Sequence, residues 1–184
     1  MDTFVEQIVK KKKDGKDIAL IVGIWILFVI VSAAAVLFLR MLGFLILCGA
    51  GYGAWWLTTE RNREFEYSLT NGSIDIDEII AQRKRKRIVS VNGEKLESAG
   101  VYDAAAQNRP FDRRVMAAPS ETEEGLWYFT YHSKKNGHTA VVFQPDNRVL
   151  SALYSGLQTT VRLETDRALR EKGITVEKNP RRGE

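Results

Sequence analysis

Two long runs of uncharged, mostly apolar residues near the start of this 184-residue chain limit its fold more than any other feature. The first run extends over 18–39 and the second over 41–57, and only Arg40 separates them. About 20 apolar residues in a helix cross the hydrocarbon core of a bilayer, and about 17 is the lower limit. One continuous helix through both runs would be about 60 Å long, twice that thickness. The sequence therefore predicts a transmembrane helical hairpin at 18–57, with its turn near Arg40 and Gly43.

A cleaved signal peptide is the main alternative for the first run. Such a signal has an apolar region of about 7–15 residues followed by a cleavage site. The run at 18–39 is longer than that, and a second apolar run follows it. We therefore expect a multi-pass membrane protein. The mean hydropathy of −0.22 conceals this division, because it averages an apolar hairpin with a polar remainder.

The charges that flank the two runs predict their orientation. Four consecutive lysines precede the first run: Lys10, Lys11, Lys12 and Lys13. Arg61 and Arg63 follow the second run, whereas the turn holds Arg40 alone. Because Lys and Arg are enriched in the cytoplasmic segments next to membrane helices, we expect both termini in the cytoplasm.

The N-terminal segment 1–17 is basic and has apolar residues at helical spacing, namely Phe4, Val5, Ile8 and Val9. A basic amphipathic segment of this kind can lie on an anionic membrane surface, with its lysines at the head groups. The alternative is a solvated tail whose lysines only set the topology. The two interpretations are compatible.

Small residues recur four apart in the second run, at Gly49 and Gly53 and at Ala50 and Ala54. Residues at this spacing share one side of a helix and let another helix approach closely. We interpret them as packing within the hairpin, with self-association of the chain as the alternative. Neither run contains Asp, Glu, Lys or His, which transporters usually place at membrane depth, so a transporter is not expected.

The remainder of the chain has the pattern of a small β-rich domain at 61–157. Asn-Gly pairs favour tight hairpin turns, and three of them lie between stretches of alternating apolar residues. These pairs are Asn71-Gly72, Asn92-Gly93 and Asn136-Gly137. After Pro145 the apolar period changes to 3.6 residues through 149–157, which indicates a helix capped by Asp146 or Asn147. A polar helix and a flexible tail are expected at 158–184.

Antiparallel strands followed by a closing helix are similar to a pleckstrin-homology-like (PH-like) barrel. The predicted fold class is therefore α+β, with an N-terminal transmembrane hairpin, a small antiparallel β domain and a C-terminal helix.

The most conspicuous motif of the β domain is a run of five basic residues, the basic cluster. Its members are Arg83, Lys84, Arg85, Lys86 and Arg87. In an extended chain these side chains alternate between two faces, so the strand cannot be buried and belongs at a sheet edge or at a protruding hairpin end. The alternative is a surface for anionic lipid or an acidic partner, since basic residues near the inner leaflet gain about 1 kcal/mol each. Nucleic-acid binding is disfavoured, because no aromatic residues are interleaved for stacking.

No pattern typical of catalysis is present in the sequence: nucleophile-elbow, phosphate-loop and zinc-protease motifs are all missing. Asp75, Asp77 and Glu78 lack the glycine and distal Glu of a calcium loop, and we expect them to pair with the basic cluster. His132 and His138 flank a predicted turn without a Cys or a convergent carboxylate, which makes a poor metal site. We therefore predict a non-enzymatic protein with no catalytic residue, metal or cofactor.

Several segments resemble a family of small, functionally uncharacterised two-span membrane proteins of Gram-positive bacteria. The similar segments are MDTFVEQIVKKKKDGKD at the start, GYGAWW in the second run, EFEYSLTNGSIDIDEIIAQRKRKR at 64–87, WYFTYH at 127–132 and FQPDNRVLSAL at 143–153. The resemblance covers most of the chain up to about Leu157. It implies a location in a bacterial plasma membrane and the organisation described above, and it carries no activity or catalytic residue over to this chain.

Together these features predict a membrane-anchored binding or scaffold module that holds a cytoplasmic domain near anionic lipid. The expected partners are the bilayer and its anionic head groups, with a protein partner or a homo-oligomer as a further candidate. The alternative function is a subunit or assembly factor of a larger membrane complex.

Overall fold

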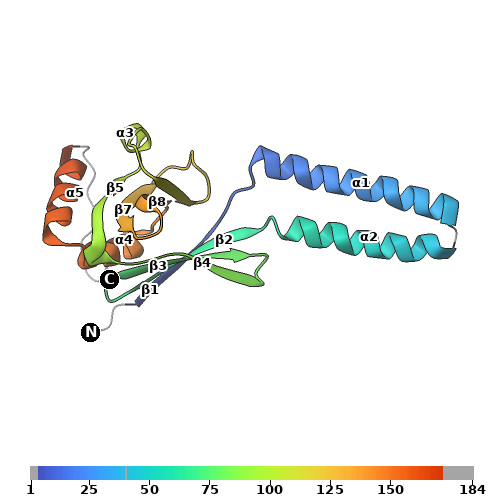
Figure 1. Ribbon diagram of the computed structural model, residues 1–184, viewed down its shortest axis with the longest axis horizontal. Helices are drawn as coiled ribbons and strands as arrows, with labels where there is room; N and C mark the ends of the chain where they lie inside the picture. Colours follow the sequence, from blue (N-terminus) through green and yellow to red (C-terminus); the bar gives the residue numbers. More distant parts are fainter. Residues whose placement is uncertain (1–3, 40, 172–184) are drawn as a thin grey trace.

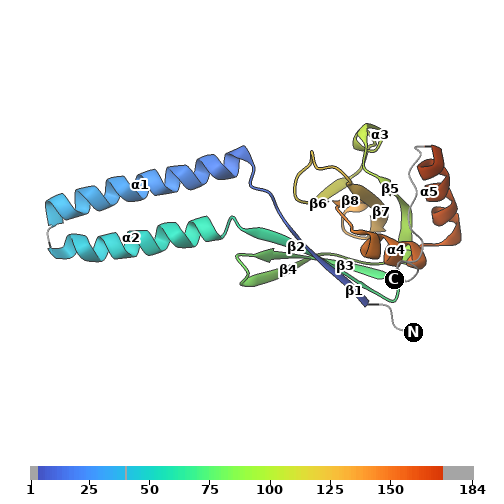
Figure 2. The ribbon, with the colours of Figure 1, turned by 180° about the vertical axis from the view of Figure 1, so that it is seen from behind.

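The computed structural model describes residues 4–39 and 41–171. A pair of long helices projects from one end of a β-rich body (Figure 1). Figure 2 shows the same arrangement from behind, with the last helix at the end of the body opposite the helix pair. The elements are β1 (Phe4–Lys10), α1 (Gly15–Leu39), α2 (Met41–Thr59), β2 (Arg63–Thr70), β3 (Ser73–Ile80), β4 (Lys84–Asn92), the 3-10 helix η1 (Gly93–Lys95), β5 (Leu96–Val101), α3 (Ala104–Gln107), β6 (Arg113–Ala117), β7 (Trp127–Ser133), β8 (Gly137–Phe143), α4 (Asn147–Gly156) and α5 (Thr159–Glu171).

The two apolar runs form α1 and α2, as predicted, and the helices extend slightly beyond the runs, from Gly15 and to Thr59. Both are long and apolar enough to cross a membrane. Large apolar side chains such as Leu37, Phe38 and Phe44 are exposed along them. So much exposed apolar surface requires lipid or a partner in place of water.

The two helices pack through small side chains. Ser32 and Ala35 of α1 and Gly43 and Ala54 of α2 are buried. A Cβ atom added to Gly43 would lie 2.5 Å from the carbonyl oxygen of Ala35. Because a backbone atom cannot give way, only glycine permits this approach near the turn of the hairpin.

The N-terminal segment corrects one prediction, because Phe4–Lys10 is the strand β1 and not a helix. β1 pairs antiparallel with β2, from Phe4 opposite Thr70 to Lys10 opposite Glu64. Its apolar residues fit both periods, but a helix this short is marginal in water, whereas the edge of β2 offers backbone partners. The side chain of Gln7 also fastens β1 to the β8–α4 connection, since it donates to the Gln144 carbonyl and accepts from the Asp146 amide.

This pairing changes the domain boundaries. The β domain predicted at 61–157 begins instead at β1, and the helix pair is an insertion between two strands that are hydrogen-bonded to each other. The segment 1–17 is therefore no separate surface helix, although its first three residues lie outside the described part of the chain.

The described strands form two four-stranded sheets and not one closed barrel. Sheet A has the order β1-β2-β3-β4 and is antiparallel throughout. Sheet B has the order β5-β7-β8-β6, and its β6 runs parallel to β8, which corrects the expectation of antiparallel strands only. The connection at 118–126 leads from β6 to β7, which is not a neighbour of β6 in the sheet. The next strand, β8, then lies between β7 and β6.

The core lies where the two sheets and α4 meet. Fully buried side chains come from sheet A, sheet B and α4, among them Tyr67, Ile76, Phe129, Phe143 and Leu153. Each large apolar side chain contributes about 1.5–3 kcal/mol when buried. The Tyr67 hydroxyl also joins the sheets, because it donates to the Ala117 carbonyl of β6 at 2.5 Å.

Both predicted C-terminal helices are present. The first is α4, and its cap is Asp146, whose carboxylate accepts from the Val149 amide at 2.8 Å. The second is α5, which belongs to the domain, since Val161 and Leu169 enter the core and the Thr165 hydroxyl donates to the Ala99 carbonyl of β5. The tail predicted after α5 lies outside the described residues.

Two of the three Asn-Gly pairs lie in β-hairpin turns. Asn71 and Gly72 join β2 to β3 with φ angles of 50° and 81°, and Gly137 ends the β7–β8 turn with φ 65°. The third pair does not form a hairpin, because Asn92 has φ −76° and caps η1, which carries the chain from sheet A to sheet B. The turn between β3 and β4 instead has Ala81 and Gln82 at φ 53° and 56°.

Candidate functional site

The basic cluster begins in the β3–β4 turn and continues into β4, which is an edge strand of sheet A. All five side chains are exposed, and they alternate between the faces of the strand. The expected edge position is therefore confirmed. The surroundings of the individual residues, however, differ sharply.

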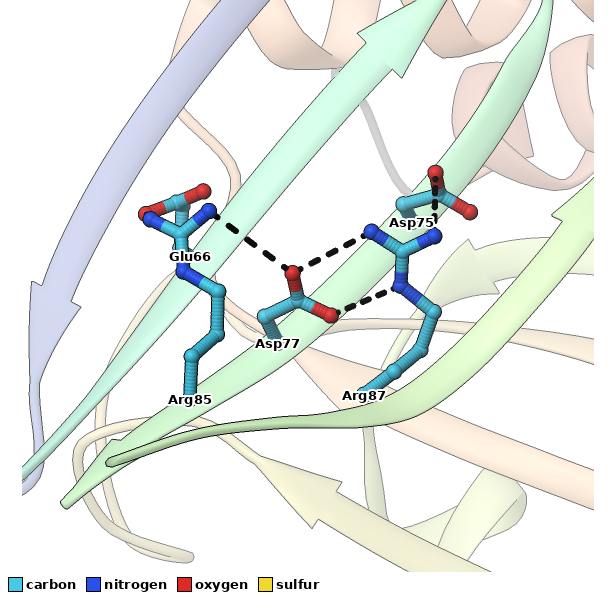
Figure 3. Close-up of polar contacts among 5 residues, drawn as sticks. All are labelled: Glu66, Asp75, Asp77, Arg85 and Arg87. Atoms are coloured by element: carbon cyan, nitrogen blue, oxygen red, sulfur yellow. Dashed lines mark hydrogen bonds and ion pairs between the residues drawn. The ribbon is translucent and has the colours of Figure 1, made fainter.

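Arg85 and Arg87 form an ion-pair network with three carboxylates (Figure 3). Arg85 donates to Glu66 at 2.5 Å and lies 4.0 Å from Asp77. Arg87 donates to both oxygens of Asp77, at 2.8 and 3.2 Å, and pairs with Asp75 at 3.2 Å. The hydrogen bonds with Asp77 and the charge of Asp75 raise the pKa of Arg87 above its ordinary value. The expected pairing of Asp75 and Asp77 with the basic cluster is confirmed, whereas Glu78 pairs with Arg63.

The carboxylates of this network lie beneath the guanidinium groups. The side chains of Glu66 and Asp77 are 5% and 7% exposed, whereas those of Arg85 and Arg87 are 58% and 55% exposed. Glu66 lies directly opposite Asp77 across β2 and β3. Two carboxylates in such a cross-strand pair repel each other, so the arginines are needed to neutralise them. Sequence reasoning missed Glu66, although the alternation of β2 places it on the face opposite Tyr67.

The first two members of the basic cluster contact the end of α2. The Arg83 guanidinium lies 4.1 Å from the ring centre of Trp56 and 5.7 Å from that of Trp55, which is cation–π geometry. The Lys84 ammonium lies 4.0 Å from the Glu60 carboxylate. These contacts place the β3–β4 turn against the helix pair, at the aromatic residues that commonly mark a membrane interface.

Backbone hydrogen bonds strengthen this junction between the sheet and the helices. The Lys11 amide donates to the Arg63 carbonyl at 2.9 Å, which continues the β1–β2 ladder towards α1. The Ala81 amide donates to the Asn62 carbonyl at 2.8 Å, so the strained β3–β4 turn is docked on the α2–β2 connection. The body is therefore held at the end of the helix pair by strands, turn and side chains together.

The N-terminal lysines lie beside this junction. Lys10 is 3.9 Å from Glu64, and Lys12 pairs with Glu123 at 2.8 Å. Lys11 lines a polar pocket of about 300 Å³, and Lys13 is exposed in the β1–α1 connection. The four lysines are thus brought to the end of the helix pair, where a membrane surface would lie if the helices cross a bilayer.

Gly49 and Gly53 do not pack within the hairpin, which corrects our preferred interpretation of this pair. A Cβ atom added to either residue would meet no described atom within 4 Å. Ala54, by contrast, is buried. The two glycines therefore lie on an outer side of α2.

The two histidines face each other across the β7–β8 hairpin, and His138 lies 3.1 Å from Glu97. Within 4–39 and 41–171, no group of three or more His, Cys, Asp or Glu side chains gathers as metal ligands would.

Two sheets with a closing helix, fused to a pair of apolar helices, define the class of this protein as a PH-like domain with a helical insertion. The chain belongs to the bacterial PH-like domain family (DUF6106), whose sequence profile matches residues 1–163. The match includes the helix pair between β1 and β2. The predicted PH-like class and the bacterial origin are thereby confirmed. A search of the curated proteins and one of the solved structures returned no match to this chain.

Proposed function

We propose that the protein is a non-enzymatic, membrane-anchored binding or scaffold module. Its helices cross a bacterial plasma membrane and hold the PH-like body at the cytoplasmic surface, close to anionic lipid. The observation that carries this proposal is the insertion of two apolar helices between the paired strands β1 and β2. Because only residues 11–14 and 60–62 connect the strands to the helices, the body stays close to the bilayer.

The charges at the helix ends support the cytoplasmic orientation. β1 and β2 are paired, so both helices leave the bilayer on the side of the body. Lys11 and Lys13 precede α1, Lys16 lies in its first turn, and Arg61 and Arg63 follow α2. Such an excess of Lys and Arg is typical of the cytoplasmic side.

The same charges support contact with anionic lipid. Lys13, Lys16 and Lys86 are exposed near the helix ends and make no ion pair within the described residues, so their charges face solvent. Each such residue near a membrane surface gains about 1 kcal/mol from anionic lipid. Arg85 and Arg87 contribute less, because the ion-pair network occupies them.

The test is the lipid preference of the full-length chain in mixed bilayers of zwitterionic and anionic phospholipid. Spin-labelled phosphatidylglycerol should associate with the protein more than spin-labelled phosphatidylcholine, and this preference should fall as salt rises. Replacing Lys13, Lys16 and Lys86 by Gln should weaken the preference. The matched control replaces three exposed arginines of α5, at the far end of the body: Arg162, Arg167 and Arg170. Equal association of the wild type with both lipids would contradict the proposal.

The outward position of Gly49 and Gly53 favours a second candidate function, a subunit or assembly factor of a membrane complex. Small residues four apart let a further helix approach α2 closely, and the described part of the chain leaves that space open. The partner would be a transmembrane helix of another protein or of a second copy.

Crosslinking in native membranes tests this candidate. Changing Gly49 and Gly53 to Ile should abolish the crosslinked species without unfolding the hairpin, because a Cβ atom at either position meets no described atom within 4 Å. Gly23 of α1 is the control, since a Cβ atom there is equally unobstructed. If the wild type gives no crosslinked partner or oligomer, the second candidate is wrong.

A further inference from the structure

A pocket of about 270 Å³ lies where the helix pair meets sheet A, and we call it the junction pocket. Its wall is formed by α1, the end of α2, the α2–β2 connection and the adjoining ends of β2, β3 and β4. The lining residues are Leu20, Ile24, Leu57, Glu60, Arg61, Arg63, Ile80 and Lys84.

The lining divides into two chemical halves. Leu20, Ile24 and Leu57 form an apolar wall on the two helices, and the basic side chains lie on the side of the sheet. The basic residues Arg61, Arg63 and Lys84 outnumber the single acidic residue, Glu60. A ligand that fits both halves carries a negative charge at one end and hydrocarbon at the other.

The ion pairs within the described residues leave donors of this pocket available. Arg61 lies 3.7 Å from Asp17 and Lys84 lies 4.0 Å from Glu60. Both distances exceed the reach of an N–H···O hydrogen bond, which is about 3.2 Å. Arg63 donates to Glu78 at 2.8 Å through one nitrogen, and a guanidinium has further N–H groups to offer.

The position of the pocket matches the depth of a lipid head group. Trp55 and Trp56 directly precede Leu57 at the same end of α2, and Arg83, beside Lys84, stacks on Trp56. Tryptophans of membrane helices prefer this interfacial depth. The volume lies just below the usual range for ligand pockets, so it accommodates only a phosphate group with the carbon atoms next to it, while acyl chains extend along the helices.

We propose that the junction pocket binds one anionic phospholipid of the cytoplasmic leaflet. The phosphate lies among Arg61, Arg63 and Lys84, and the start of an acyl chain lies against Leu20, Ile24 and Leu57. The inference rests on the proposed membrane anchoring. It goes further than that proposal, because it assigns one bound lipid to a defined pocket. Lys13, Lys16 and Lys86, which attract anionic lipid in general, are not part of this pocket.

Native mass spectrometry of the full-length protein tests this binding. The protein is purified in mild detergent, delipidated and titrated with phosphatidylglycerol or phosphatidylcholine. One phosphatidylglycerol should be retained per chain, in preference to phosphatidylcholine. The double variant Arg61→Gln with Lys84→Gln should weaken this retention by an order of magnitude or so. An equal loss of charge at Arg162 and Arg167 of α5 should leave it unchanged.

A second variant keeps the charges and fills the space. Ile80 is half-buried and lines the pocket, and Ile80→Trp should also abolish retention of the single lipid. The Ile80→Trp protein should still prefer anionic lipid in mixed bilayers, because the exposed lysines remain. Retention that is unchanged in both pocket variants, or reduced equally by the α5 control, would overturn the junction pocket while leaving the proposed anchoring intact. Absence of any anionic preference in the wild type would overturn both.

Discussion

At the scale of single residues, the burial of two carboxylates determines which basic side chains stabilise the fold. Glu66 and Asp77 are almost entirely covered, and a buried carboxylate without a partner is strongly destabilising. Arg85 and Arg87 supply the compensating charge from an exposed strand edge. The basic cluster is therefore not one uniform surface: two of its arginines stabilise the sheet, Arg83 stacks on α2, and the lysines remain for other contacts.

The ion-pair network predicts unequal effects for neighbouring substitutions. Arg85→Gln should lower the free energy of unfolding by about 1–3 kcal/mol, because Glu66 loses its hydrogen-bonded cation. We expect a value in the lower part of this range, because solvent screens the charge of an arginine that is 58% exposed. Lys86→Gln should change it by less than about 0.5 kcal/mol. Urea unfolding in detergent micelles, followed by circular dichroism, measures both. Equal effects of the two variants would contradict this role, and adding Glu66→Gln to Arg85→Gln should restore part of the loss.

Tyr154 leads to a prediction about alkaline pH. Its hydroxyl is buried and has no hydrogen-bond partner among the described residues. Burial, and secondly the charge of Asp166, raise the pKa of Tyr154 above its ordinary value near 10. The folded state therefore keeps a proton that the unfolded state loses, so its stability is complete below pH 10 and falls as pH rises beyond it.

Tyr154→Phe should remove this dependence and the unsatisfied hydroxyl together. We expect unfolding at neutral pH to cost up to about 1 kcal/mol more than in the wild type, and the decline above pH 10 to be shallower. Some decline should remain, because burial also raises the pKa of Tyr67. Tyr67→Phe is the contrasting variant: it should destabilise at neutral pH, because its hydroxyl donates to Ala117. Thermal unfolding at a series of pH values measures both, and a less stable Tyr154→Phe at neutral pH would refute the prediction.

At the scale of elements, the helices, strands and turns that could be predicted are those whose own residues carry a local signal for that structure. The uncharged runs, the Asn71-Gly72 turn and the helix capped by Asp146 all carry their own signals. β1 was mispredicted because its apolar spacing fits a helix as well as a strand, and the deciding partner, β2, lies more than 50 residues further along the chain. The arginine–carboxylate pairing was predictable from β4 and β3, but the part played by Glu66 depends on the register of β2.

The β3–β4 turn was missed for a related reason. Ala81 and Gln82 are not turn formers, yet both adopt positive φ angles, which cost a residue with a Cβ atom on the order of 1 kcal/mol each. Changing the pair to Asn-Gly should therefore raise the free energy of unfolding by about 1–2 kcal/mol, since Asn-Gly prefers this turn. The same urea titration measures the change. Ala81→Val is the control and should destabilise, and an Asn-Gly variant no more stable than the wild type would show that the turn is not strained.

At the scale of the whole molecule, the paired strands explain how one chain combines an apolar helix pair with a β-rich body. The helix pair occupies the place of the loop between β1 and β2, so folding of sheet A brings both helix ends to one point. The exposed apolar residues of the helices then need no contact with the core of the body. Composition alone could not reveal this arrangement, because the apolar runs come before most of the domain in the sequence, whereas the fold places the helix pair within the first strand pair.

This insertion predicts the topology that labelling of intact cells would find. In a background with Cys48→Ser, Met41→Cys places a thiol at the turn of the hairpin, where the native side chain is 91% exposed. Lys86→Cys places one on the body, next to the helix ends. A membrane-impermeant maleimide should label Met41→Cys in intact cells and Lys86→Cys only after the membrane is opened. Because β1 and β2 are hydrogen-bonded to each other, the two ends of the hairpin cannot lie on opposite sides of a bilayer. Labelling of both positions in intact cells, or of neither, would therefore exclude the transmembrane hairpin itself, whereas the reverse pattern would keep the hairpin and invert its orientation.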